Sequence, residues 1–181
     1  MGRTALLVID MLNPYRHQDA DRLQAGVEPM VGPLAGLLRR ARDRDDDRLL
    51  TIYVNDNEGD FSATREDIVD RALSGERPDL VKPIEPTDSC IFLAKVRHSA
   101  FFGTPLEYLL HQADVDTVLL TGQVTEQCIL YTALDAYIRH LNISVVEDAV
   151  AAIDPELGSA ALRMMERNMR AELISAADCF A

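Results

Sequence analysis

A cysteine stands where a short apolar run gives way to a helical pattern. The run at 115–122, "VDTVLLTG", is rich in β-branched residues and closes with a glycine, which predicts a buried strand of a parallel sheet. The residues that follow share one helical face: Ile129, Thr132, Ala133, Ala136 and Tyr137. We therefore expect Cys128 in the first turn of a helix, at the carboxyl end of a strand. A helix N-terminus favours a thiolate there, although Cys128 could equally be a small apolar residue that fills a gap in the core.

Two charged residues end other predicted strands. Asp10 closes the run at 4–10, and Lys95 closes the run at 90–95. An aspartate can accept a proton from a thiol, and a lysine beside it favours both the carboxylate and the thiolate. Taken singly, Asp10 fits a turn and Lys95 a surface position. Because the carboxyl ends of parallel strands meet at one edge, all three residues together favour a catalytic site with an activated Cys128 thiolate.

Strand-like and helix-like segments alternate along the chain. We expect strands at 4–10, 49–55, 90–95, 115–122, 143–148 and 171–175, the last at an edge of the sheet. We expect helices at 26–44, from Ser62 to 73, from Thr104 to 113, after Cys128, and at 155–169, with a loop over 75–88. This alternation predicts an α/β fold: a single domain over 1–181, built as a three-layer α/β/α sandwich around a mostly parallel, Rossmann-like, six-stranded sheet.

The composition excludes several classes of partner. The net charge is -12 and the pI is near 4.6, so the surface should repel nucleic acid and anionic membranes. The three cysteines are far apart and form no CxxC pair, and the phosphate-binding motifs GxGxxG and GxxxxGK[ST] are absent from the sequence. We expect a cytoplasmic protein that needs no cofactor and acts on a small molecule.

Five stretches, in order along the chain, resemble the isochorismatase-like cysteine hydrolases, a family that includes nicotinamidases and N-carbamoylsarcosine amidohydrolases. They are "LLVIDMLNPY", "TIYVNDNEG", "KVRHSAFFGTPLEYLL", "LLTGQVTEQCILYTALDAY" and "VVEDAVAA". The resemblance implies a catalytic triad of Asp10, Lys95 and Cys128, and a cis peptide between Gln123 and Val124. It also implies an oxyanion hole made by the backbone N–H groups of Val124 and Cys128, and a homodimer or homotetramer, since family members often form these.

The sequence departs from the nicotinamidase pattern at 55–61. Asp56 matches a metal-binding aspartate of those enzymes, but no histidine follows it, and Glu58 and Asp60 would bind a hard cation only weakly. We therefore expect no metal and no nicotinamidase activity. For the substrate pocket we name the residues that follow the first three strands: Leu12, Tyr15, Asn55, Phe101 and Phe102. Cys90 and Cys179 are assigned to packing. Arg97 and His98 could contact a substrate carboxylate or pair with the acidic surface, and both are left unassigned.

The function expected from these features is a cysteine-dependent hydrolase of a small amide or ureido compound that works through a thioester intermediate. An isochorismatase-type hydrolase of a vinyl ether is one alternative, and the retained cysteine argues against it. A noncatalytic binding module on the same fold is another, and a redox-sensing thiol is a third.

Overall fold

The protein is described by a computed structural model that covers residues 2–44 and 48–180. Its six strands are β1 (Arg3–Ile9), β2 (Leu49–Asp56), β3 (Ile91–Lys95), β4 (Val115–Gln123), β5 (Asn142–Ala151) and β6 (Glu172–Ile174). They form one sheet in the order β3-β2-β1-β4-β5-β6, and every neighbouring pair is parallel. The predicted α/β sandwich is thus confirmed, with β6 at an edge as expected.

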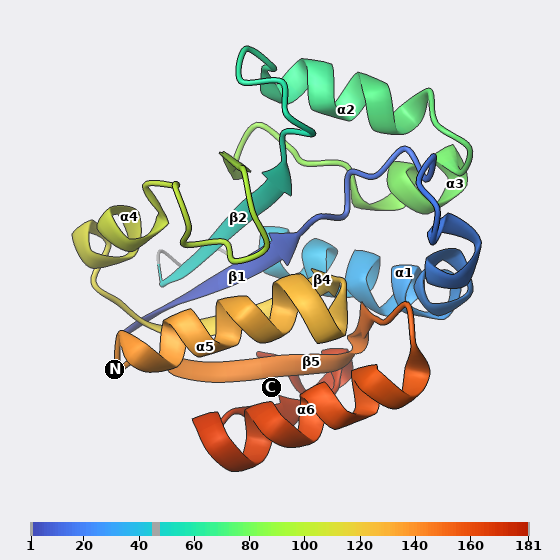
Figure 1. Cartoon of the computed structure of the whole chain (residues 1–181). Helices are drawn as coiled ribbons and strands as arrows, with labels where there is room; N and C mark the ends of the chain where they lie inside the picture. Colours follow the sequence, from blue (N-terminus) through green and yellow to red (C-terminus); the bar gives the residue numbers. More distant parts are fainter. Residues whose placement is uncertain (1, 45–47, 181) are drawn as a thin grey trace.

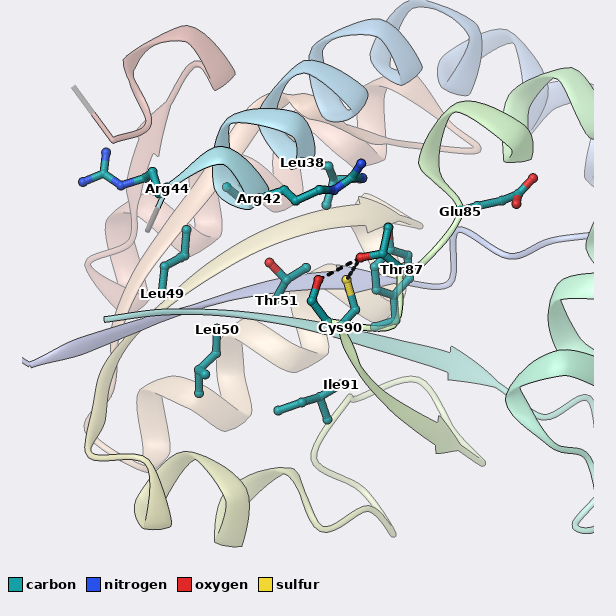
Figure 2. A pocket seen from close by; sticks show the side chains of 13 residues that line it. Leu38, Arg42, Arg44, Leu49, Leu50, Thr51, Glu85, Thr87, Cys90 and Ile91 are labelled. Atoms are coloured by element: carbon teal, nitrogen blue, oxygen red, sulfur yellow. Dashed lines mark hydrogen bonds between the residues drawn. The ribbon is translucent and has the colours of Figure 1, made fainter. Parts of the chain in front are cut away.

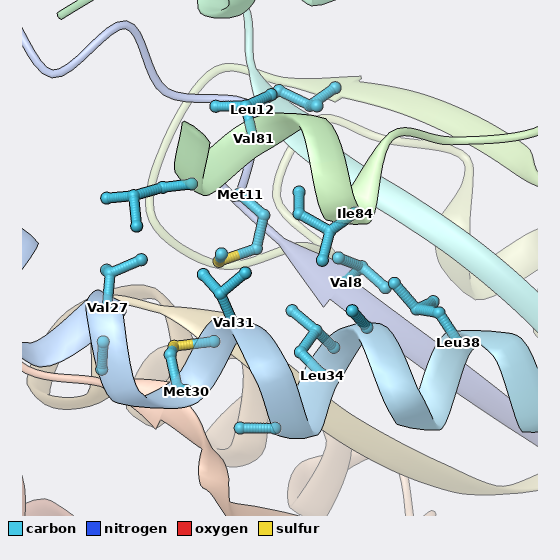
Figure 3. Packing of buried hydrophobic residues seen from close by; sticks show 14 of the residues in the cluster. Val8, Met11, Leu12, Val27, Met30, Val31, Leu34, Leu38, Val81 and Ile84 are labelled. Carbon is cyan, nitrogen blue, oxygen red and sulfur yellow. The ribbon is translucent and has the colours of Figure 1, made fainter. Parts of the chain in front are cut away.

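Helices cover both faces of this sheet (Figure 1). One face carries α1 (Ala20–Asp43), and the other carries α4 (Leu106–Gln112), α5 (Leu130–Ile138) and α6 (Pro155–Met169). Alternate residues of β1 serve the two layers, as a period of two requires: Leu6 and Val8 face α1, whereas Leu7 and Ile9 face the α4–α6 layer. An apolar stripe on α1 packs against β1 and the segments around it (Figure 3). The stripe consists of Val27, Met30, Val31, Leu34 and Leu38, and it contacts Val8, Met11 and Ile84.

Three helices begin at residues other than those expected. Helix α1 begins at Ala20 rather than at residue 26. Helix α2 (Arg65–Leu73) begins after Thr64, which forms a capping box with Asp67, so Ser62 lies outside it. Helix α4 begins one residue after Pro105, although the Thr104 hydroxyl still accepts a hydrogen bond from the Leu106 N–H.

The loop expected over 75–88 is wrong in part. Residues Pro78–Val81 form the short helix α3, and Lys82–Ile84 continue as a 3₁₀ turn. Pro78 occupies the first turn, where a missing N–H costs nothing, and Leu80, Val81 and Ile84 are buried against α1. Burial of these apolar side chains therefore outweighs the proline-rich composition. Within the residues that the structure describes, no helix is both long and apolar enough to cross a membrane.

Candidate active site

The carboxyl edge of the sheet brings together the three residues singled out above. Asp10 follows β1 directly, Lys95 is the last residue of β3, and Cys128 lies in the turn after β4. The Lys95 Nζ is 2.9 Å from the Asp10 Oδ2 and 3.8 Å from the Cys128 Sγ. A carboxylate, an ammonium and a thiol are thus in mutual contact.

Asp10 is held by the backbone around it. Its Oδ1 accepts a hydrogen bond from the Asp56 N–H at 2.8 Å, and its carbonyl oxygen accepts one from the Gln123 Nε2 at 2.7 Å. Its φ is 53°, in the left-handed region that a non-glycine residue rarely adopts and that recurs at functional sites. Burial raises the pKa of the Asp10 carboxyl, and Lys95 and a hydrogen bond from the Cys128 thiol oppose this rise only in part. A raised pKa makes the carboxylate a better base.

Lys95 is the charged centre of the group and is only 1% exposed. Burial acts to lower its pKa, but the Asp10 carboxylate, the Cys128 sulfur and the Asp56 carboxylate together raise the pKa above the usual lysine value. Asp56 Oδ2 is 3.6 Å from the Nζ. The ammonium therefore stays protonated and balances one buried anion.

The pKa of Cys128 is shifted in the direction opposite to the one expected from the sequence, which was toward a thiolate. Burial and the neighbouring Asp10 carboxylate raise the pKa of this thiol to about 12, and the Lys95 ammonium and a hydrogen bond from the Val124 N–H do not compensate. The sequence gives no measure of burial, and the cost of taking a thiolate out of water beside a carboxylate outweighs the Lys95 ammonium and the start of the helix. The resting site therefore holds a thiol, a carboxylate and an ammonium.

The turn that carries Cys128 also differs from an ordinary helix start. Thr125–Ile129 form a π-helical turn, and α5 begins only at Leu130. The Val124 carbonyl accepts hydrogen bonds from the N–H groups of Gln127 at 3.0 Å and Ile129 at 3.1 Å. Such turns are frequent at functional sites. The Gln123–Val124 peptide is cis, and the Val124 N–H is hydrogen-bonded to the Cys128 sulfur.

A cleft of about 270 Å³ opens beside Asp10 and Val124. Of the five residues named for the pocket, Leu12 and Asn55 line it, and the Asn55 amide is hydrogen-bonded to both the N–H and the carbonyl of Leu12. The other three do not line it. Tyr15 is buried with its hydroxyl 3.5 Å from the Gln123 Oε1, Phe101 is buried beneath the Arg139 guanidinium, and Phe102 is 59% exposed.

His98 lies beside the thiol, a position that the sequence analysis left unassigned. Its Nδ1 is 3.9 Å from the Cys128 Sγ, and its ring lies 5.4 Å from the ring of Tyr131 on α5. The residue comes three positions after Lys95 in irregular chain, where no periodicity predicts the direction of a side chain. The only indication in the sequence that His98 lies near the site is that it follows Lys95 by three residues.

The segment after β2 holds its carboxylates in local interactions. Asp56 Oδ1 accepts the Glu58 N–H, and the Arg71 guanidinium lies 3.9 Å from Glu58 and 3.7 Å from Asp60. Across 2–44 and 48–180, no three His, Cys, Asp or Glu side chains are grouped so as to hold a metal ion. Independence from metal stays a prediction.

A second cavity, of about 190 Å³, lies between the end of α1 and the start of β2 and β3 (Figure 2). It includes the half-buried Cys90, whose sulfur is 3.4 Å from the Thr87 hydroxyl, and it includes none of the three grouped residues. Cys179 is buried in the core on the α1 side.

Comparison with known proteins decides the family. The isochorismatase domain matches residues 4–178, nearly the whole chain. The chain belongs to the isochorismatase family. An uncharacterized isochorismatase family protein, YaaI of Bacillus subtilis, is 33% identical over 93% of this chain and 92% of its own.

Other similar proteins have names that refer to an amidase activity. Maleamate amidohydrolase of Pseudomonas putida is 31% identical over 82% of this chain and 72% of its own length. A probable inactive nicotinamidase of Arabidopsis thaliana is 30% identical over 87% of this chain and 85% of its own. Among solved structures, the N-carbamoylsarcosine amidase of Thermoplasma acidophilum is 27% identical over 99% of both chains, with a TM-score of 0.72.

Proposed function

We propose that this protein is a cysteine amidohydrolase that cleaves a small amide or ureido compound through a thioester intermediate. The observation that supports it is the contact between the Lys95 ammonium, the Asp10 carboxylate and the Cys128 thiol, of which Asp10 also lines a cleft. The kinship with amidohydrolases agrees with it.

In the first half of the reaction, the Asp10 carboxylate takes the thiol proton as the Cys128 Sγ attacks the substrate carbonyl. The raised pKa of Asp10 suits it to hold that proton, and the Lys95 ammonium offsets the charge that remains. The backbone N–H groups of Val124 and Cys128 stabilise the tetrahedral oxyanion.

In the second half, Asp10 returns the proton to the leaving amine, and the C–N bond breaks to leave a thioester on Cys128. Water attacks the thioester while Asp10 accepts one of its protons. Collapse of this second tetrahedral intermediate releases the acid, and Asp10 returns its proton to the departing Cys128 sulfur, which restores both the thiol and the carboxylate. The same carboxyl group thus serves as base and then acid in each half of the reaction.

A screen of small amides and ureido acids for ammonia release tests the proposal. Cys128→Ala should lower kcat/KM at least about 10³-fold, whereas Cys90→Ser, a matched change of the half-buried cysteine beside Thr87, should leave it unchanged. An acyl-enzyme on the Cys128 peptide should be seen by mass spectrometry after rapid quenching, and activity should persist in chelator.

Two results would contradict the proposal. Hydrolysis of a vinyl ether that survives Cys128→Ala would identify the isochorismatase-type reaction instead. Tight binding of small amides with no turnover and no acyl-enzyme would identify a binding module.

A further inference from the structure

The cleft beside Asp10 and Val124 is lined by four carboxylates, whereas Cys128 and Lys95 are not among its lining residues. Asp10 and Asp56 follow β1 and end β2, Asp19 precedes α1, and Glu58 lies in the segment after β2. Among the described residues, no lysine or arginine lines the cleft, and its only other ionisable side chain is His17. A substrate that reaches Cys128 through this cleft therefore passes between negative charges.

Nearby cations do not cancel this charge. Lys95 does not line the cleft, and its ammonium is shared by Asp10 at 2.9 Å and Asp56 at 3.6 Å. Arg71 is similarly shared by Glu58 at 3.9 Å and Asp60 at 3.7 Å.

Two further arginines are close in sequence to the site. Arg16 lines an adjoining hollow and is 3.4 Å from its own partner, Glu76. Arg97 is exposed and does not line the cleft. The local balance thus stays negative when these cations are counted, and the chain as a whole carries -12.

The remaining wall of the cleft is apolar in part. Leu12, Leu23, Val124 and Ile153 contribute to it. A substrate with a methylene chain or a flat apolar ring fits such a wall. With its scissile carbonyl at Val124, the other end of the substrate lies among Asp19, Asp56 and Glu58. A positive charge at that end of the substrate lowers the energy of the complex with these carboxylates, and a negative charge raises it.

We propose that the substrate is an amide or ureido compound whose non-reacting end is a protonated amine, and that the cleft discriminates against amides that bear a carboxylate. This inference rests on the proposed amidohydrolase function. One charge pair at about 4 Å in water changes an equilibrium constant about fivefold, so several carboxylates set a preference of at least that size.

Hydrolysis of three matched amides gives the first test. They are 4-aminobutanamide, pentanamide and glutaramate, which end in an ammonium, a methyl group and a carboxylate. We expect kcat/KM for ammonia release to fall in that order, by about fivefold or more at each step at low salt. Faster release from glutaramate than from 4-aminobutanamide would overturn the inference and leave the amidohydrolase proposal standing.

A second measurement needs no turnover. The wild-type protein is treated with 2-aminoethyl methanethiosulfonate, which is cationic, or 2-sulfonatoethyl methanethiosulfonate, which is anionic. The rate of mixed-disulfide formation at Cys128 is measured for each reagent. It is divided by the rate at which the same reagent reacts with free 2-mercaptoethanol, which corrects for the intrinsic reactivity of the reagent. We expect the cationic reagent to be favoured at least about fivefold. Equal ratios would overturn the inference, whereas failure to hydrolyse any amide in a broad screen bears on the proposed function.

Variants separate the cleft from the overall charge. Asp19→Asn and Glu58→Gln should each reduce the preference for the cationic reagent, since both side chains line the cleft. Glu172→Gln removes the same charge from the exposed edge strand β6 and should leave the preference unchanged. An equal reduction by Glu172→Gln would assign the preference to the net charge of the molecule and overturn the role of the cleft.

Discussion

Cys128 carries its proton at rest because its thiol is buried and has a carboxylate beside it. Burial and the Asp10 carboxylate outweigh the Lys95 ammonium, so the pKa of the thiol is raised to about 12. One buried ammonium balances one buried anion, and a second anion is costly. In the proposed reaction, thiolate character therefore arises only as Asp10 accepts the proton during attack. This accounts for a base in contact with the nucleophile.

The raised thiol pKa predicts slow alkylation of the free protein. At pH 7, Cys128 should react with iodoacetamide more slowly than a free thiol, whose pKa is about 8.5. Asp10→Asn removes a cause of the raised pKa and should speed the reaction several-fold, whereas Lys95→Met should slow it. Mass spectrometry of labelled peptides against pH measures these rates, with the buried Cys179 as the internal control. Labelling of wild-type Cys128 at pH 6 faster than a free thiol would contradict the assignment.

The Asp10–Lys95 ion pair predicts a non-additive effect on stability. Asp10→Asn leaves the Lys95 ammonium, 1% exposed, with Asp56 at 3.6 Å as its carboxylate partner. We expect the free energy of unfolding to fall by about 3–5 kcal/mol. The double variant Asp10→Asn/Lys95→Met removes the stranded charge and should recover most of this loss. Urea unfolding of both variants measures the difference, and a double variant no more stable than Asp10→Asn would refute the argument.

At the scale of elements, the sequence predicted those parts of the fold that follow from periodicity. Short apolar runs located all six strands, and their carboxyl ends located Asp10, Lys95 and Cys128 at one edge. The π-helical turn at Thr125–Ile129 could not be predicted in this way, because it depends on how the chain leaves β4 beside β1. The positions of His98 and Phe102 are set by irregular chain after β3, which has no period to read.

Gly122 allows β4 to approach β1 closely just before the turn that carries Cys128. Its φ is 112°, and a Cβ added there would lie 2.1 Å from the carbonyl oxygen of Ile9 on β1. Gly122→Ala should therefore cost several kcal/mol, at least about 3, or prevent folding, and should displace the turn that carries Cys128. Gly32→Ala is the matched control: it lies within α1 with nothing within 4 Å of the added Cβ, and it should stabilise the protein by about 0.5–1 kcal/mol. Thermal unfolding distinguishes the two, and equal effects would contradict the close approach of β4 to β1.

At the scale of the whole molecule, charge is the dominant feature. A chain of 181 residues carries a net charge of -12, and the candidate active-site cleft shares this negative character. The ion pairs of the protein are mostly on the surface. In one of them, the side chains of Arg16 and Glu76 are 57% and 64% exposed, and such pairs contribute little to stability. Repulsion among the excess carboxylates acts on the compact state over longer distances.

This imbalance predicts that salt stabilises the protein. Raising NaCl from 10 to 150 mM shortens the screening length from about 30 Å to about 8 Å, which weakens long-range repulsion more than contacts within an ion pair. We expect a gain of about 1 kcal/mol, or an increase in Tm of about 2–4 °C for a chain of this size. The double variant Glu166→Gln/Glu172→Gln, which removes two exposed charges, should start from a higher Tm at low salt and gain less from added salt. Scanning calorimetry at several salt concentrations measures both. A Tm that falls as salt is added would show that attraction within ion pairs outweighs the net repulsion.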